Sequence, residues 1–193
     1  MKKYPIPNYT DRKSRNEYLI NLIDSSFQET KTILNIGGGQ KRYLKNSKYN
    51  VTEIDKEGDN DLNLDLDNIK KLPFEDNSFD TVVGLDVLEH LENFHLVSSE
   101  MLRVSKKNVI ISLPNCFHTF FTILLNKKTS DPNNNGVYNK FYGLPIKKPA
   151  DRHRWFFTNE DVERFFNNFS KENNIKVEYI LPKSKSLKSK IIS

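Results

Sequence analysis

Hydrophobic residues occur along the chain in short runs that alternate with longer segments of helical periodicity. Five apolar or β-branched runs have the length and composition of strands, and they cover residues 31–36, 49–54, 62–66, 79–85 and 108–114. Three segments place apolar residues three and four positions apart, as amphipathic helices do, over residues 14–29, 86–105 and 158–173. Strands that alternate with helices predict an α/β fold, a mostly parallel sheet with helices on both faces in a three-layer α/β/α sandwich.

Capping residues mark the starts of two of these helices. Ser14 is the predicted N-cap of the first helix, where Glu17 completes a capping box, and Thr158 is the predicted N-cap of the last helix, with Asp161 three residues on. The link between the second and third strands is too short for a crossover helix. Either this link is a tight loop or the third strand is misplaced. A last strand is predicted over residues 176–181.

The chain changes character after its fifth strand. Residues 115–126 are aromatic and apolar, whereas residues 127–154 are rich in Asn, Pro, Lys and Tyr and are predicted to form a long loop. Loops of this length inside a compact domain are usually functional covers or disordered segments. We therefore predict one domain over residues 1–182, in which residues 115–155 form a long cover loop, followed by a basic tail at residues 183–193.

Composition and charge narrow the class of protein. The 193 residues carry a net charge of +5 and include one cysteine, Cys116, which excludes an internal disulfide and a cysteine-based metal site. The N-terminus lacks the apolar region of a secretory signal, and no apolar stretch approaches the roughly 20 residues that span a bilayer. A cytoplasmic protein is therefore expected. The basic tail suits nucleic acid or an anionic membrane, although a solvated terminus is the favoured interpretation.

Three consecutive glycines, Gly37, Gly38 and Gly39, follow the first predicted strand. Glycine adopts positive φ without strain and lets a ligand approach bare backbone N–H groups, but it also serves in ordinary tight turns. Asp55 ends the second strand, where an acidic residue is placed to accept hydrogen bonds from ribose hydroxyl groups. Glu53 is its rival, because period-two alternation puts both carboxylates on the same side, but only Asp55 lies at the tip of the strand.

The segment "LDLDNIKKLPFEDNSFDTVVGLDVLEHL", residues 64–91, adds the third element, and the chain now resembles the class I S-adenosylmethionine-dependent methyltransferases. The resemblance runs from Ile33 to Asn115, with a weaker echo at residues 153–166. It implies a Rossmann-like fold and S-adenosylmethionine as cofactor. The positions that it assigns to cofactor binding are Asn35, the glycines Gly37, Gly38 and Gly39, Asp55 at the ribose, Asp65 and Leu66 by the adenine, and Asp86 and Val87 after the fourth strand.

Two positions depart from the family pattern. The family usually has an acidic residue where this chain has Asn35, and a third glycine of its motif where this chain has Lys41. The amide of Asn35 still offers an acceptor to the cofactor's ammonium group, but without a negative charge. Lys41 places a cation near the positive groups of the cofactor unless its side chain turns into solvent. Both changes favour a lowered cofactor affinity, or a relative of the family that does not catalyse.

An oxygen or nitrogen acceptor also needs a base that removes its proton. Three candidates follow, in sequence order Asp86, His90 and His153. His90 is equally suited to pack beneath the cofactor, and Asp86 stands at the tip of the fourth strand. His153 lies in "DRHRWFFT", which serves either as part of an acceptor site or, the favoured interpretation, as a structural latch with Trp155 and Phe156 buried. His95 and His118 are expected to pack rather than to catalyse.

The acceptor-side candidates are the guanidinium groups of Arg152 and Arg154, which suit carboxylate or phosphate, and the hydroxyl groups of Tyr138 and Tyr142 in the long loop. No set of Asp, Glu and His residues has the spacing of a metal site. The (N/D)-P-P-(Y/F) tetrapeptide of enzymes that methylate nucleic-acid amino groups is missing after the fourth strand. We therefore expect a small-molecule or saccharide-type acceptor. The alternatives are a binding module with weak or no activity and, ranked lower, an RNA methyltransferase that uses the basic tail.

Overall fold

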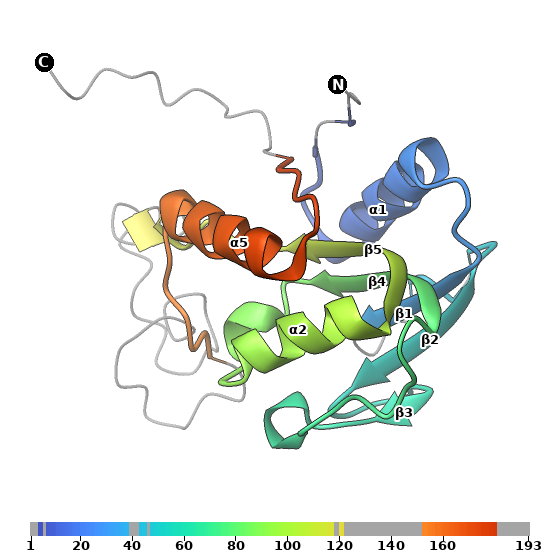
Figure 1. The fold of residues 1–193 in the computed structure, drawn as a ribbon. Helices are drawn as coiled ribbons and strands as arrows, with labels where there is room; N and C mark the ends of the chain where they lie inside the picture. The colour runs from blue at the N-terminus through green and yellow to red at the C-terminus, as the bar shows by residue number, and fades with distance from the viewer. Residues whose placement is uncertain are drawn as a thin grey trace, which may run out of the picture.

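The computed structural model describes residues 4–5, 7–38, 43–45, 47–117, 120–121 and 152–180. Its centre is a five-stranded sheet in which all neighbouring strands are parallel, in the order β3-β2-β1-β4-β5 (Figure 1). The strands are β1 (Thr32–Ile36), β2 (Asn50–Asp55), β3 (Leu62–Asn63), β4 (Phe79–Leu85) and β5 (Ser105–Ser112). The α/β fold with a parallel, Rossmann-like sheet is therefore confirmed.

The sheet register aligns the ends of the central strands. Ile36 of β1 pairs with Ile54 of β2 on one side and with Gly84 of β4 on the other. The link from β2 to β3 is a loop without a helix, so the prediction of a tight loop is confirmed. The third strand is shorter than predicted, because only two residues pair with β2, and a 3-10 helix, η1 (Leu66–Asn68), follows where the strand was expected to end.

Helix α1 (Arg12–Ser26) covers one face of the sheet. Its buried residues pack against alternate positions of the strands in a cluster of Leu19, Ile23, Ile33, Leu44, Val51 and Val83. The predicted cap was wrong, because the helix begins one turn earlier. Asp11 is the N-cap: its carboxylate accepts a hydrogen bond from the Ser14 N–H at 2.8 Å, and the Ser14 hydroxyl accepts one from the Asp11 N–H at 3.2 Å.

The opposite face is covered by α2 (Phe94–Val104) and α5 (Asn159–Asn173), which lie in front of the strands in Figure 1. Their apolar residues share a cluster with the strands, formed around Leu34, Ile36, Ile54, Val82, Val97 and Met101, with Phe165 and Phe166 packed against it. Thr158 caps α5 and forms a capping box with Asp161, as predicted. Together with α1 on the other face, these helices complete the three-layer sandwich.

Two other predictions along the chain were wrong. The single helix expected over residues 86–105 is instead a 3-10 turn, η2 (Leu88–His90), followed by α2, and Val104 is the last helical residue before β5. The last predicted strand has no counterpart in residues 176–180, the part of it that the structure describes. These residues alternate charged and apolar side chains, but none of the described strands pairs with them.

A buried ion pair fixes α2 to the loop that precedes β4. Glu100 accepts a hydrogen bond from the Leu72 N–H at 2.6 Å and another from Arg103 Nη2 at 2.6 Å. Arg103 also donates to the Phe74 carbonyl oxygen at 2.9 Å and to Asp76 at 2.7 Å. Hydrogen bonding from Arg103 holds the pKa of Glu100 below its ordinary value. This network therefore contributes stability only while Glu100 is ionised.

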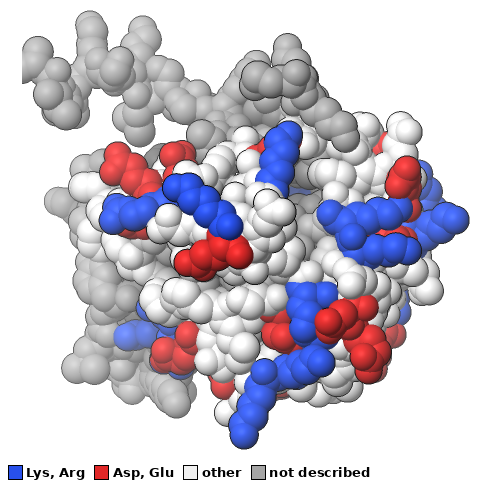
Figure 2. Space-filling view, viewed as in Figure 1, with Lys and Arg blue, Asp and Glu red and all other residues white. Residues whose placement is uncertain are grey.

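The surface carries both signs of charge. On the face drawn in Figure 2, Lys and Arg side chains lie beside Asp and Glu side chains rather than in one basic area. The exposed ion pairs Lys13–Glu17 and Lys48–Asp24 are examples of such neighbours. Within the described part of the chain, no helix has both the length and the apolar character needed to cross a membrane.

Candidate active site

The carboxyl ends of β1, β2 and β4 meet at one edge of the sheet, because the strands are parallel and in register. The chain runs from β1 outward through β2 to β3 and then returns to β4 on the other side of β1. In open α/β sheets, ligands bind at such a switch point, outside the carboxyl ends of the strands. The residues that follow β1, β2 and β4 therefore form the candidate site.

Gly37, directly after β1, is a position where only glycine fits. Its φ is +71°, in the left-handed region, and a Cβ there would lie 2.6 Å from Cγ2 of Val87. Its N–H donates to the carbonyl oxygen of Ile54 at 2.8 Å, which ties the turn to the end of β2. The structure thus brings Gly37 and Val87, both predicted as cofactor-binding residues, into direct contact at the switch point.

Asn35 in β1 and Glu53 in β2 form a buried pair beside this turn. They are partners in the strand register, and Asn35 Nδ2 donates to Glu53 Oε1 at 3.3 Å. Their exposed fractions are 5% and 0%. A Cβ on Gly38 would lie 2.9 Å from Asn35 Nδ2 and 3.4 Å from Glu53 Oε1. In the sequence, Glu53 is only an alternative to Asp55 as the acidic residue at the ribose. In the structure, the carboxyl group of Glu53 lies beside Asn35, the position where the family usually has an acidic residue.

Asp55 is the last residue of β2 and is partly buried. Its Oδ1 accepts a hydrogen bond from the Lys56 N–H at 2.6 Å. The residue before it, Ile54, receives the hydrogen bond from Gly37. Asp55 therefore lies at the tip of its strand and next to the glycine turn, in the arrangement that the sequence pattern predicts.

Asp65 and Leu66 lie farther along the same edge, after β3. Asp65 is the N-cap of η1, and its carboxylate forms an ion pair with Lys56 Nζ at 2.8 Å. Hydrogen bonding from Lys56 lowers the pKa of Asp65. Leu66 is buried in the cluster under α2. The structure thus gives both residues structural contacts in addition to the adenine-side role that the resemblance implies.

Asp86 follows β4 in a left-handed conformation, with φ of 52°. Its carboxylate forms an ion pair with Arg15 of α1 and accepts a hydrogen bond from the Ser112 hydroxyl group at 2.5 Å. The Asp86 N–H also donates to the carbonyl oxygen of Ser112, in β5, at 3.1 Å. Asp86 is therefore held by groups from α1 and β5, which the sequence did not indicate.

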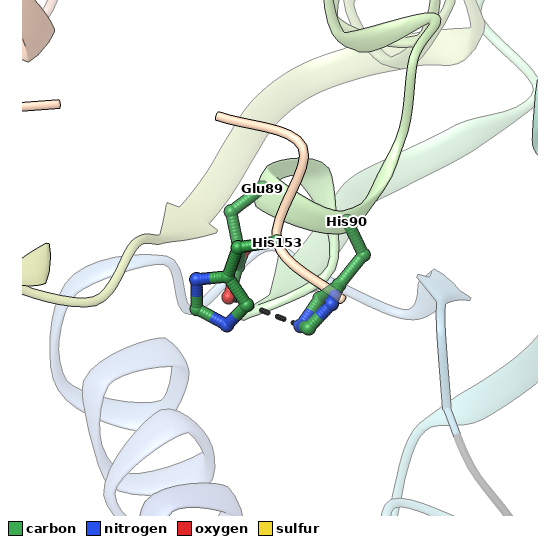
Figure 3. Close-up of side chains that lie close together, drawn as sticks. All are labelled: Glu89, His90 and His153. Atoms are coloured by element: carbon green, nitrogen blue, oxygen red, sulfur yellow. Dashed lines mark ion pairs between the residues drawn. The ribbon is translucent and has the colours of Figure 1, made fainter. Parts of the chain in front are cut away.

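Glu89, His90 and His153 converge on one point beside the end of β4 (Figure 3). Glu89 and His90 belong to η2, and His153 comes from the segment that precedes α5. His90 Nε2 lies 3.6 Å from Glu89 Oε1, and the two imidazole rings meet edge to face with centroids 4.4 Å apart. Burial raises the pKa of Glu89 to about 7. The structure therefore joins two of the predicted bases and adds Glu89 to them.

Backbone hydrogen bonds hold the His153 segment against η2. The Arg154 and Trp155 N–H groups donate to the Glu89 carbonyl oxygen at 2.8 and 3.3 Å, and Trp155 Nε1 donates to the Leu91 carbonyl oxygen at 2.6 Å. The Trp155 ring packs edge to face on Phe94. These contacts have the form of the latch that the sequence favoured.

The other predicted residues of this segment differ in their partners and in their exposure. Arg154 pairs with Glu92 at 3.0 Å on the surface, and Arg152 is partly buried. The expectation of a buried Phe156 was wrong: its side chain is 48% exposed, and it contacts Phe117, with ring centroids 4.8 Å apart. His95 packs against Trp155 and α5, as a packing histidine was expected to do. The predicted residues Gly39, Lys41, His118, Tyr138 and Tyr142 lie outside the described residues.

Comparison with solved structures finds distant likenesses. A Haloferax volcanii protein in complex with the Trm112 methyltransferase activator is 13% identical with a TM-score of 0.48, over 81% of this chain and 71% of that one. An Aquifex aeolicus S-adenosylmethionine-dependent methyltransferase is 15% identical with a TM-score of 0.43, over 82% and 88%. A Methanococcus maripaludis protein proposed to be such an enzyme is 16% identical with a TM-score of 0.46, over 92% of each chain.

Comparison with curated proteins finds no significant match. Comparison with family models finds one that is described as a methyltransferase domain and that matches residues 28–113. This range begins before β1 and ends after β5, so it contains the whole sheet and the strand ends that form the candidate site. The match supports the resemblance over this range: residues 28–113 carry a methyltransferase domain, and S-adenosylmethionine is the cofactor that it implies.

Proposed function

We propose that the protein transfers a methyl group from S-adenosylmethionine to an oxygen or nitrogen atom of a small-molecule or saccharide-type acceptor. One observation carries the proposal. The glycine turn after β1, Asp55 at the end of β2 and Val87 after β4 lie together at the switch point of the sheet. The domain that performs this function is proposed to extend over residues 1–182.

The residues at the switch point suit this cofactor. Gly37 and Gly38 leave no side chain between the turn and its neighbours, which would let a ligand approach the backbone closely. Asp55 would accept hydrogen bonds from the ribose hydroxyl groups, and Asp65 and Leu66 would lie toward the adenine. Val87 would form an apolar wall. When bound, S-adenosylmethionine supplies a methyl group already activated on a sulfonium centre.

Glu53 would compensate for the absence of an acidic residue at the position of Asn35. We propose that its carboxylate supplies the negative charge that the cofactor's ammonium group requires, through the amide of Asn35, which donates to Glu53 at 3.3 Å. An amide that donates through Nδ2 keeps its carbonyl oxygen available as an acceptor. The pair would therefore replace one acidic side chain by two residues on adjacent strands, and the Asn35 substitution would be compatible with cofactor binding.

Proton removal from the acceptor is assigned to the histidines rather than to Asp86. The carboxylate of Asp86 is occupied by Arg15 and Ser112, so it holds α1 and β5 at the site edge. The imidazole rings of His90 and His153 meet edge to face beside the end of β4, and imidazole is the side chain that most often serves as a general base. Arg152 and Arg154 flank His153 in the sequence and are proposed to bind acceptor groups that carry negative charge, with Tyr138 and Tyr142 contributing from residues 115–155.

The test is methyl transfer from S-adenosylmethionine labelled in its methyl group, using the full chain and a panel of sugars, nucleotide sugars, phenols, amines and transfer RNA. We expect label in a small molecule, and a large loss of turnover in His90→Gln with cofactor binding retained. Cofactor binding without transfer to any acceptor would favour the binding module. Transfer to RNA that disappears when residues 183–193 are deleted would contradict the proposed acceptor class.

A further inference from the structure

Three side chains from two separate segments present ligand atoms to a common point. One nitrogen of His90, one nitrogen of His153 and one carboxylate oxygen of Glu89 all lie within 4.8 Å of one another. Figure 3 shows the three side chains gathered at one place, with a dashed line for the ion pair between Glu89 and His90. This spacing is close to that of atoms that share one ion, since ligands about 2.0–2.2 Å from a metal lie within roughly 4 Å of each other.

The scaffold holds this geometry without help from a ligand. Glu89 and His90 are fixed by η2 directly after β4, and the carbonyl oxygen of Glu89 receives the N–H groups of Arg154 and Trp155. Trp155 is anchored in turn by its bond to the Leu91 carbonyl oxygen at 2.6 Å. His153 directly precedes Arg154 and is therefore held against η2, although the two segments are far apart in the sequence.

Glu89 supplies a second and independent reason to look for a cation. Its side chain is 1% exposed, and its Oε2 accepts no hydrogen bond from any residue that the structure describes. A buried carboxylate without compensation is costly, and proteins usually satisfy it with a cation or with hydrogen bonds. The guanidinium group of Arg15, whose charge acts on Glu89, forms its ion pair with Asp86 instead. A positive ion between Glu89 and the two imidazoles would satisfy the carboxylate.

The ligand set indicates the class of ion. Two imidazoles and one carboxylate bind divalent first-row metals such as zinc, iron, cobalt and manganese, whereas calcium and magnesium prefer ligand sets made of oxygen atoms. Three protein ligands also leave at least one coordination position for water or a substrate oxygen, as catalytic metal sites do. The set therefore fits an open site rather than a closed structural one.

We propose that Glu89, His90 and His153 bind one divalent transition-metal ion at the carboxyl end of β4. Binding of this ion does not depend on methyl transfer, so the proposal stands or falls separately from the proposed function. Together with that function, the ion would activate the acceptor in place of His90 and His153 as free bases, because a bound metal lowers the pKa of an oxygen that coordinates it. The acceptor class would then include molecules with such an oxygen.

The experiment uses the untagged full-length protein, stripped with a chelator and then titrated with cobalt(II) while the visible absorption spectrum is recorded. We expect ligand-field bands that saturate at one ion per chain and that zinc(II) abolishes by competition. Glu89→Gln and His153→Ala should each weaken cobalt binding by at least about 10-fold, since loss of even an outer-shell partner costs about 10–100-fold. Circular dichroism establishes that each variant is folded.

His95→Ala is the matched control, because its ring contacts Trp155 in the same region but belongs to no ligand set. Its cobalt affinity should equal that of the wild type. A second readout is thermal unfolding, in which zinc should raise the midpoint of the wild type and leave that of Glu89→Gln unchanged. A folded wild-type protein without cobalt bands would overturn the proposal, as would variants of Glu89 and His153 that bind like the wild type.

Discussion

Replacement of Gly37 by alanine probes the closest packing in the candidate site. Two separate costs follow from the structure. The backbone φ of +71° is unfavourable for a residue with a Cβ, and the new Cβ would lie 2.6 Å from Cγ2 and 2.9 Å from Cβ of Val87. Distances below 3.0 Å are not tolerated between such carbon atoms, so Val87 or the turn has to move.

The two costs differ in size and in origin. A left-handed conformation costs a non-glycine residue about 1–2 kcal/mol. Overpacking by one methyl group adds about 1–3 kcal/mol. We therefore expect Gly37→Ala to lower the free energy of unfolding by about 2–5 kcal/mol. Domains of this size are typically stable by about 5–15 kcal/mol, so the variant should still fold at 25 °C.

Urea denaturation of a double-mutant cycle with Val87→Ala separates these costs. Val87→Ala removes Cγ2 but keeps Cβ, so it relieves part of the overpacking and none of the backbone strain. Gly37→Ala should therefore cost at least about 1 kcal/mol less in the Val87→Ala background, a coupling of the size that residues in contact show. A cost below about 0.5 kcal/mol for Gly37→Ala alone, or no coupling to Val87, would refute this explanation of the glycine.

Two further predictions concern ion pairs that hold the fold around the site. Glu100→Gln should cost about 1.5–3 kcal/mol at pH 7, since it removes a charged hydrogen bond from the partly buried Arg103, whose remaining ionic partner is the exposed Asp76. Because the folded pKa of Glu100 is lowered, this stability is present above its unfolded pKa of about 4.3 and is lost as the pH falls through the folded value. In urea denaturation, the difference in the free energy of unfolding between wild type and variant should therefore be smaller at pH 3 than at pH 7, and an equal or larger difference at pH 3 would contradict the predicted direction. Arg15→Gln should cost about 1.5–3 kcal/mol by loss of a charged hydrogen bond to Asp86, whereas Lys13→Gln on the exposed side of the same helix should cost below about 0.5 kcal/mol. Equal effects of the two substitutions would show that the Asp86 contact does not stabilise α1.

Local patterns in the sequence predicted the elements whose burial they control. The apolar runs of β1, β2 and β4 follow from burial, because a strand in the middle of a parallel sheet is buried on both faces. The run of β5 was also predicted, although β5 is the last strand in the described order. The capping box at Thr158 was also predicted, since it depends only on residues three positions apart. The wrong cap at Ser14 has a related cause, because Ser14 does take part in a capping box but as the partner of Asp11.

Contacts that depend on tertiary packing could not be predicted from the sequence. The strand expected at residues 176–181 has an alternating pattern, but a pattern does not reveal whether a neighbouring strand is free to pair with it. The ion pair of Arg15 with Asp86 joins residues 71 positions apart, and it changes Asp86 from a candidate base into a residue with a structural partner.

The Glu89–His90–His153 group shows the same limit at the site itself. His90 and His153 are recognisable as candidates one at a time, but no spacing in the sequence indicates that they meet. The second segment is brought to η2 by hydrogen bonds from the Arg154 and Trp155 backbone to Glu89 and from the Trp155 ring to Leu91. The search for metal-ligand spacing along the chain therefore missed a group that the fold assembles.

The central claim is that the switch point of the sheet binds S-adenosylmethionine, and isothermal titration calorimetry tests it most directly. The full-length protein is titrated with S-adenosylmethionine and, separately, with S-adenosylhomocysteine, and Asp55→Ala serves as the variant because Asp55 ends β2 at this point. The account predicts micromolar binding of both compounds by the wild type and loss of that binding in folded Asp55→Ala. No heat of binding with either compound, from wild-type protein shown to be folded, would contradict it.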